Sequence, residues 1–314
     1  MSIGIYFGID TSNYTTSAAA VTVAGEVFCA KRLLSVPSGS RGMRQSDALF
    51  CHTRDLSEII EEVLSGVREK YGDFTLLGVG VSDRPRPVEG SYMPCFLAGV
   101  NAAKAAASLA GVPLFLFSHQ EGHIEAARNG AAELGKRFED KDFYAFHLSG
   151  GTTEFLRVHE TENGYSAEIL AEALDLTCGQ LIDRCGVKLG LGFPAGKELE
   201  KLAEKSGTHY KIRIPKKEGG INLSGFENKF DQMLEQGIPG EELARFVFDV
   251  TEAAVRALLE YREGDGPVLF SGGVTSSHLL KEALADGKHF FSPPAFTADN
   301  AIGTALLCRK GATL

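Results

Sequence analysis

Hydrophobic runs and polar breaks near the start of the chain predict strands followed by a helix. Residues 5–9 form a short apolar run that ends in polar residues, which is typical of a strand. Residues 18–23 and 25–33 predict two more strands that pair as a hairpin. Residues 56–71 then repeat apolar side chains at helical spacing, with charged residues between them.

Three further segments complete a first unit. Residues 76–81 and 114–117 are apolar runs that predict buried strands, and the alanine-rich residues 97–110 between them predict a closely packed helix. The order of elements is therefore three strands, a helix, a strand, a helix and a strand.

The same order begins again in the second half of the chain. Residues 143–148, 154–158 and 168–173 predict three strands, and residues 241–261 predict the longest helix. Residues 268–270 predict another strand, and residues 297–307 predict a closing helix.

This repetition predicts an α/β protein built from two tandem units, 1–139 and 140–314, without a low-complexity linker. A chain of 314 residues is long enough for two ordinary cores. Hydrophobic residues make up 44% and charged residues 23%, which is globular composition.

Charge narrows the choice of partners. A formal net charge of −9 argues against binding nucleic acid through the overall field of the protein. The notable basic cluster comprises Lys211, Arg213, Lys216 and Lys217, and a solvated loop is favoured there over a local RNA contact.

The cysteines and the apolar runs indicate where in the cell the protein is expected. The six cysteines are scattered without a CxxC pair, which favours a reducing environment. The N-terminus has no basic secretory region, and no apolar run reaches membrane-spanning length. We therefore expect a soluble, cytoplasmic protein that does not act at a membrane.

Three predicted strands end in small and polar residues. These turns are Asp10-Thr11-Ser12, Ser149-Gly150-Gly151-Thr152-Thr153 and Ser271-Gly272-Gly273-Val274-Thr275. Paired glycines let backbone N–H groups converge and let a ligand approach closely, which suits phosphate oxygens. One such turn alone favours a tight hairpin, but two at equivalent points of tandem units favour a nucleotide held between the lobes. Asp10 could hold a cation or a water beside the phosphates.

Two histidines form a candidate metal site. His119 and His123 lie four residues apart at the start of a predicted helix, so both imidazoles can reach one ion. Glu121 stands third in this motif rather than second, so this is not the HExxH arrangement of zinc proteases. Asp299 and His147 are the candidates for further ligands, and such a set suits iron or zinc alike.

Together these motifs resemble the TsaD family of tRNA threonylcarbamoyladenosine synthases, once called sialoglycoprotein endopeptidases. The resemblance spans nearly the whole chain, and its most specific part is HQEGH at 119–123, which is similar to the family's HxEGH metal motif. The other similar segments are GIDTS from Gly8, LSGGTT from Leu148, Asp183-Arg184-Cys185, LGLGFPAG from Leu189, LSGF from Leu223 and SGGV from Ser271.

The resemblance implies an ASKHA (actin/hexokinase/Hsp70-like) fold with two RNase H-like lobes and a central cleft for nucleotide and metal. It implies one divalent metal, iron or zinc, held by His119, His123 and Asp299, with His147 where some members place a tyrosine ligand. Mg²⁺ that accompanies a nucleotide is a further option. From the turns and the resemblance together, the expected nucleotide contacts are Asp10, Thr11, Ser12, His147, Leu148, Ser149, Gly150, Gly151, Asp183, Gly196, Gly272, Gly273 and Ser277.

Several turns depart from the family's pattern, whereas the metal ligands are kept. The departures are Asn13-Tyr14-Thr15-Thr16 in place of C-D-E-T, residues 84–90 in place of a GPG turn, Thr152 in place of a histidine, Asp175-Leu176 in place of a D-D pair, and Ser277 in place of an asparagine. This combination is typical of a paralogue with a retained scaffold and an altered substrate.

The resemblance implies a metal-dependent transferase that binds ATP or threonylcarbamoyl-adenylate and passes the threonylcarbamoyl group to an adenosine in tRNA. It also implies partner proteins, or a homodimer or heterodimer with another ASKHA protein. The motifs do not identify catalytic residues. One alternative is a different acceptor, whose carboxylate or phosphate Arg84 and Arg86 could hold. The other is a non-catalytic nucleotide-binding partner of a true synthase.

Overall fold

The computed structural model describes residues 2–12, 14–34, 43–133, 141–162, 164–297 and 301–313. The chain forms two compact units. The first comprises Met1–Glu133, Glu160–Ser166 and Ala298–Leu314, and the second comprises Leu134–His159 and Ala167–Thr297. These units interleave along the chain, whereas the predicted lobes 1–139 and 140–314 are contiguous.

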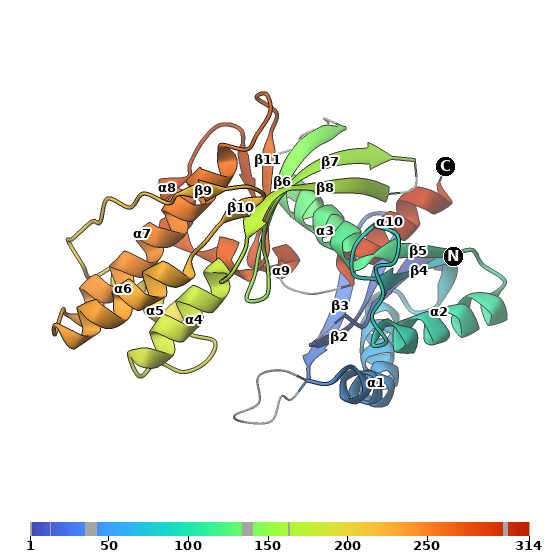
Figure 1. Cartoon of the computed structure of the whole chain (residues 1–314). Coiled ribbons are helices and arrows are strands. Elements are labelled where there is room, and N and C mark those ends of the chain that lie inside the picture. Colours follow the sequence, from blue (N-terminus) through green and yellow to red (C-terminus); the bar gives the residue numbers. More distant parts are fainter. Residues whose placement is uncertain are drawn as a thin grey trace. The chain divides into compact units, whose positions relative to one another are not determined.

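The first unit is built on a five-stranded sheet with the order β3-β2-β1-β4-β5 (Figure 1). Its strands are β1 (Ile3–Asp10), β2 (Thr15–Thr22), β3 (Val27–Leu33), β4 (Phe74–Arg84) and β5 (Leu114–Ser118). Strands β1 to β3 pair antiparallel, and β1, β4 and β5 pair parallel. The carboxyl ends of these three parallel strands therefore meet at one edge of the sheet, where α/β proteins place functional residues.

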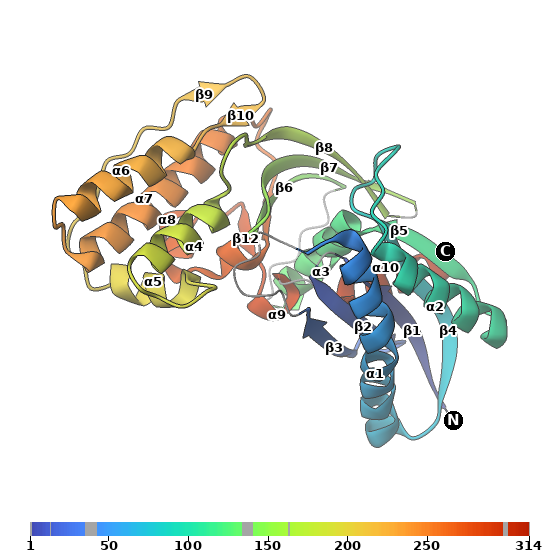
Figure 2. The ribbon, with the colours of Figure 1, turned by 60° about the horizontal axis from the view of Figure 1, so that its bottom comes forward.

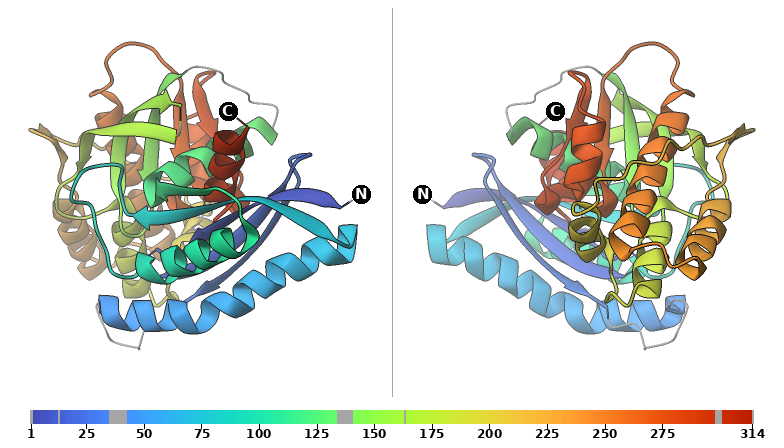
Figure 3. Two further views of the ribbon diagram at one scale, coloured as in Figure 1. Left: turned by 90° about the vertical axis from the view of Figure 1, so that its right-hand side faces the viewer. Right: turned by 90° about the vertical axis from the view of Figure 1, so that its left-hand side faces the viewer.

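Helices cover both faces of this sheet. α1 (Gln45–Tyr71) and α2 (Phe96–Ala110) pack on one face, and α10 (Ile302–Ala312) packs on the other, next to α3 (His119–Glu133) (Figure 3). Glycines in the strands let α10 approach closely. A Cβ at Gly8 would lie 2.5 Å from the backbone nitrogen of Ala305, and one at Gly80 would lie 2.7 Å from the carbonyl oxygen of Thr304.

The second unit contains a seven-stranded sheet with the order β12-β11-β6-β7-β8-β10-β9. Its strands are β6 (Asp142–Leu148), β7 (Thr153–Thr161), β8 (Gly164–Ala173), β9 (Lys216–Lys217), β10 (Gly220–Ile221), β11 (Val268–Ser271) and β12 (His289–Phe291). Its helices are α4 (Cys178–Lys188), α5 (Gly196–Ala203), α6 (Ser224–Glu235), α7 (Gly240–Leu259), the 3₁₀ helix η1 (Gly273–Ser276), α8 (His278–Ala283) and α9 (Pro294–Thr297). Figure 2 shows α4 to α7 gathered on one side of the sheet.

The predicted helix at 241–261 is confirmed as α7, whose buried face includes Leu243, Val247 and Leu258. It is not the longest helix, because α1 has 27 residues and α7 has 20. The first turns of α1 bury His52 and Asp55, so an apolar pattern could not reveal them. The closing helix begins at Ile302 rather than at residue 297, because Thr297 ends the separate short helix α9.

The structure also describes the surroundings of the cysteines and the length of the helices. Cys178, Cys185 and Cys308 are buried, and burial raises the pKa of their thiols to about 11, about 12 and about 12 respectively. Such thiols behave as small apolar side chains. Among the described helices, none is both long enough and apolar enough to cross a lipid bilayer.

Candidate functional site

The two predicted metal-binding histidines face each other on the first turn of α3. Their Nε2 atoms are 2.9 Å apart. The Nδ1 atom of His119 lies 2.6 Å from Oδ2 of Asp10, which is buried at the end of β1. These groups meet because β1 and β5 end at the same edge of the sheet.

The protons of this cluster can be assigned from its contacts. A carboxylate accepts only, so Nδ1–H of His119 donates to Asp10, and in the neutral tautomer this leaves a lone pair on Nε2. Carboxylates commonly orient metal-binding histidines in this way. Two nitrogens that each lie ~2.1 Å from one ion are about 3.0 Å apart when they subtend a right angle and about 3.4 Å apart at the tetrahedral angle. The histidine pair therefore fits a metal, and Asp10 orients His119.

The other two predicted metal ligands come from other parts of the chain. Asp299 falls outside the described residues. His147 belongs to the second unit, near the end of β6. In the described part of the chain, no group of three or more His, Cys, Asp or Glu side chains is arranged to hold a metal. The cluster by itself thus supplies two nitrogen ligands.

Glu121, inside the histidine motif, has a structural role. Its Oε2 accepts hydrogen bonds from the backbone N–H and the hydroxyl of Ser118, both at 2.7 Å. Its Oε1 accepts from the backbone N–H of Tyr165, at the tip of the β7–β8 hairpin. A buried carboxylate with three donors is tied to the fold, which agrees with its unsuitable position for a zinc-protease base.

The first predicted phosphate turn contacts the protein itself. The hydroxyl of Thr11 donates to the carbonyl of Cys95 and accepts from the backbone N–H of Gly99, at 3.1 and 3.2 Å. The backbone N–H of Ser12 donates to Oδ1 of Asp10. These bonds fix the start of α2 and the Asp10 carboxylate.

Arg84, considered for an alternative acceptor, has acidic partners within the first unit. Its Nη1 donates to Asp83 at 2.6 Å, and its Nη2 lies 3.7 Å from Oε2 of Glu121. The guanidinium therefore stabilises the end of β4. Arg86 also contacts this loop, since its backbone N–H donates to the hydroxyl of Ser91.

A cavity of about 550 Å³ in the second unit gathers several of the predicted nucleotide contacts. Its volume is within the usual range for small-molecule sites. The lining residues are Gly150, Gly179, Ile182, Asp183, Pro194, Gly196, Lys197, Glu200, Phe248, Gly273, Val274, Ser276 and Ser277. The predicted contacts brought together here are Gly150, Asp183, Gly196, Gly273 and Ser277.

The glycines of this unit fall into two kinds. A Cβ at Gly272 would lie 2.2 Å from the carbonyl oxygen of Leu148, and Gly272 has φ of 94°, so the fold itself requires glycine there. A Cβ at Gly150 or Gly273 would meet no heavy atom of the described chain within 4 Å. Neither has a left-handed backbone. Because both line the cavity, the space beside them is open to a ligand.

The other predicted turn residues of this unit do not line the cavity. The hydroxyl of Ser149 accepts hydrogen bonds from the backbone N–H groups of Gly151 and Thr152, at 3.3 and 3.1 Å. Leu148 is fully buried. The predicted contacts of this unit that do not line the cavity are His147, Leu148, Ser149, Gly151 and Gly272.

Asp183 is the acidic side chain of the cavity with capacity to bind a ligand. Its Oδ1 accepts from the backbone N–H of Ala195 at 2.8 Å. Burial raises the pKa of the Asp183 carboxyl above its ordinary value, and the bond from Ala195 only partly opposes this. Glu200 is already engaged, because its Oε1 accepts from the hydroxyl of Ser277 and from the backbone N–H of Leu279 at 3.0 Å.

The sequence analysis did not predict Lys197, a basic side chain that lines the cavity. It lies in the first turn of α5, directly after the predicted contact Gly196. No described residue forms an ion pair with it, whereas Lys201 on the same helix pairs with Glu198 at 2.9 Å. A cation beside a glycine turn was a signal available in the sequence.

Solved structures show which fold this is. The chain superposes on component A of the (R)-2-hydroxyglutaryl-CoA dehydratase of Acidaminococcus fermentans with a TM-score of 0.58, at 19% identity, covering 99% of each chain. It superposes on HypF of T. kodakarensis with a TM-score of 0.62, at 14% identity, covering 99% of this chain and 48% of that one. The protein thus has an ASKHA-type α/β fold, as the sequence predicted.

Sequence comparison narrows this class to one family. Residues 40–306 match the model of TsaD, described as tRNA N6-adenosine threonylcarbamoyltransferase. The protein of that name from Bacillus subtilis (strain 168) is 32% identical over 321 residues, covering 94% of this chain and 86% of that protein. The one from Methanopyrus kandleri is 26% identical over 308 residues, covering 94% and 84%. The chain belongs to the TsaD family.

Proposed function

We propose that this protein is a transferase that binds threonylcarbamoyl-adenylate, or ATP, and passes the threonylcarbamoyl group to an adenosine in tRNA. The observation that carries this proposal is the cavity of the second unit. There Asp183, Lys197 and the open glycines Gly150 and Gly273 line one space of nucleotide size. Family membership supplies the reaction.

In the proposed reaction, the exocyclic amine of the adenosine attacks the carbamoyl carbon of the adenylate. A new C–N bond forms, the bond from carbon to the phosphate oxygen breaks, and AMP leaves with the bonding electrons while the amine releases a proton. Asp183 accepts hydrogen bonds from the ribose hydroxyls. Lys197 pairs with the phosphate, and its positive charge stabilises the charge that AMP gains on leaving.

The first unit would hold one divalent ion, iron or zinc. His119 and His123 would bind it through Nε2, with Asp10 orienting His119 through Nδ1. Asp299 and His147 are the proposed further ligands. When bound, such an ion supplies Lewis-acid stabilisation of oxygen charge. Elemental analysis tests this site: His119→Ala should lose the metal, and Asp10→Asn should weaken its retention, whereas unchanged metal in both contradicts the assignment.

Calorimetric titration with AMP and adenosine tests the cavity. We expect Lys197→Ala to weaken AMP binding about tenfold and to leave adenosine binding unchanged, because only AMP carries a phosphate. Lys201→Ala is the matched control, since Lys201 lies one turn away and does not line the cavity. Equal losses for AMP and adenosine, or no binding by the wild type, contradict the proposal.

Nucleoside mass spectrometry of tRNA tests the acceptor. A strain that depends on this protein should contain N6-threonylcarbamoyladenosine, and the same strain with Asp183→Ala should lose it. Loss of a different carbamoylated product would indicate another acceptor. We place the reaction in the cytoplasm, with tRNA, an adenine nucleotide and a second ASKHA protein as partners.

A further inference from the structure

Residues 207–215 of the second unit form an extended segment that follows α5 and precedes β9 in the sequence. This segment lies over helix α7. Its side chains alternate: Tyr210, Ile212 and Ile214 are partly or fully buried, whereas Lys211 and Arg213 are exposed. This is the pattern of a strand with one solvated face. The segment is nevertheless not part of either sheet.

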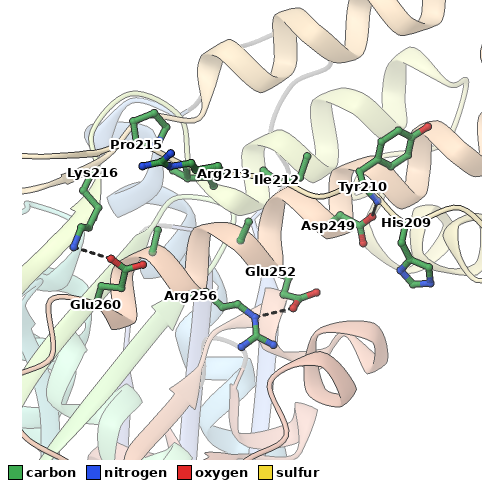
Figure 4. A pocket seen from close by; sticks show the side chains of 13 residues that line it. His209, Tyr210, Ile212, Arg213, Pro215, Lys216, Asp249, Glu252, Arg256 and Glu260 are labelled. Carbon is green, nitrogen blue, oxygen red and sulfur yellow. Dashed lines mark hydrogen bonds and ion pairs between the residues drawn. The ribbon is translucent and has the colours of Figure 1, made fainter.

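A groove of about 430 Å³ separates this segment from α7 (Figure 4). Small side chains on the helix, Ala253 and Ala257, leave the space. Both buried and exposed residues of the segment line the groove. The backbone N–H of Tyr210 donates to Asp249 at 2.7 Å, which ties the segment to α7.

The charges around the groove are unequal. Each acidic side chain that lines it has a basic partner: Asp249 with Arg245 at 2.7 Å, Glu252 with Arg256 at 2.8 Å, and Glu260 with Lys216 at 2.7 Å. Lys211 and Arg213 form no ion pair with any residue that the structure describes. The surplus charge on this face is therefore positive, in a chain whose formal net charge is −9.

We propose that the exposed face of residues 211–217, the basic segment, binds phosphate groups of the tRNA on which the protein acts. The proposal rests on the proposed function, because that function requires tRNA. A protein of net negative charge needs a local group of cations to bind RNA phosphates. Alternate side chains of an extended segment are about 6.7 Å apart, so Lys211 and Arg213 can each meet a separate phosphate.

The local geometry favours RNA over a small anion. Lys211 and Arg213 are exposed rather than enclosed, and Lys217 continues the positive charge into β9. Contacts spread along an extended segment suit a polyanion, because a single small anion could contact only part of the row of cations. Guanidinium groups such as that of Arg213 bind phosphate by two parallel hydrogen bonds.

The test is the salt dependence of binding to an unmodified tRNA transcript, measured by fluorescence anisotropy. We expect the double variant Lys211→Ala/Arg213→Ala to bind more weakly at low salt. We also expect the slope of log K against log[KCl] to fall by roughly 1 for each side chain removed. The matched control is Lys104→Ala/Lys205→Ala, two exposed lysines without ion pairs among the described residues. Both variants lose two positive charges, which changes −9 to −11.

Amide hydrogen exchange supplies a local readout. Bound tRNA should slow exchange at residues 211–214 in the wild type and not in the double variant. Equal effects of both double variants would show that net charge alone matters, and would overturn the proposal. An unchanged slope would also overturn it, and would favour an acidic protein segment as the occupant of the groove.

These experiments distinguish an error in the proposed RNA-binding surface from an error in the proposed function. If AMP binds in the cavity and the modified nucleoside forms, but the slope does not change, only the RNA-binding role of the basic segment is wrong. If the slope changes as expected but neither AMP binding nor the nucleoside is found, the proposed chemistry fails and the RNA surface stands.

Discussion

Neighbouring glycines in the turn after β11 do different things. Gly272 has φ of 94° and ψ of 159°, a backbone that is almost restricted to glycine, and it packs against Leu148. Gly273 is conformationally ordinary and faces the cavity. The fold therefore requires the first of these two glycines, whereas the second borders the open space of the cavity.

Alanine at each position separates these roles. We expect Gly272→Ala to lower the free energy of unfolding by at least about 1–3 kcal/mol, because of backbone strain and the clash with Leu148. Gly273→Ala should leave that free energy within about 0.5 kcal/mol of the wild type, while AMP binds about tenfold more weakly. Urea denaturation and calorimetric titration measure both quantities. Equal destabilisation by the two variants would remove the distinction.

The buried carboxylate of Asp183 should slightly lower the free energy of unfolding of the protein without ligand. Burial raises the pKa of its carboxyl in the folded protein, so folding disfavours the ionised form. This cost is present above the folded-state pKa and disappears as the pH falls through it.

Asp183→Asn removes the charge and nearly keeps the shape. We therefore expect a higher melting temperature than the wild type at neutral pH, a difference that shrinks as the pH is lowered, and weaker AMP binding. Thermal denaturation across pH 4 to 8, at roughly one-unit steps, checks the sign. If Asp183→Asn melts at a lower temperature than the wild type at every pH, the hydrogen bond from Ala195 to the carboxylate stabilises the protein more than burial of the charge destabilises it.

At the scale of the elements, helix α4 begins at a capping box. The hydroxyl of Thr177 accepts from the backbone N–H of Gln180 at 3.0 Å, and Oε1 of Gln180 accepts from the backbone N–H of Thr177. The Thr177 hydroxyl also donates to the carbonyl of Gly150 at 3.0 Å. One side chain thus fixes both the start of α4, which carries Asp183, and the turn that lines the cavity.

Thr177→Ala should therefore affect stability and binding together. The loss of the cap should cost about 1 kcal/mol of unfolding free energy, and AMP should bind more weakly because the turn at Gly150 is released. Thr177→Ser keeps the hydroxyl and should restore both. Restoration of stability without restoration of binding would show that the methyl group, rather than the hydrogen bonds, positions the turn.

The elements differ in how far the sequence could predict them. Every strand predicted from an apolar run is present, because β1, β4, β6 and β11 are buried on both faces and read as continuous apolar segments. Helices α4 to α6 were not predicted, since they are short and mix polar with apolar residues. The T-x-x-Q capping box at Thr177 was the available signal for α4.

At the scale of the whole molecule, the two units are not separate stretches of chain. The C-terminal helix α10 belongs to the first unit, where it packs on β1 and β4 through Gly8 and Gly80. The tip of the β7–β8 hairpin also belongs there, and Tyr165 bonds to Glu121 in the histidine motif. The histidine cluster thus depends on residues from both halves of the sequence.

Removal of the last helix should accordingly unfold the first unit. We expect deletion of residues 301–314 to abolish amide protection in β1 and β4, because one face of their sheet loses its cover. Deletion of residues 313–314, beyond the end of α10, should leave protection unchanged. Hydrogen exchange followed by mass spectrometry distinguishes them, and protected strands after the longer deletion would contradict the interleaved units.

The sequence by itself determined the α/β class, the strands that read as apolar runs, the family and the motif of the histidine pair, because these depend on local periodicity and on residues close in the chain. It did not predict the short strands β9, β10 and β12. Only the tertiary structure decided which turn residues line a cavity, which glycines the fold requires, and that Asp10 orients His119 rather than facing open space. These facts depend on contacts between distant segments, such as Asp10 with His119 and Leu148 with Gly272. A one-dimensional pattern carries no record of which strand ends meet at a sheet edge.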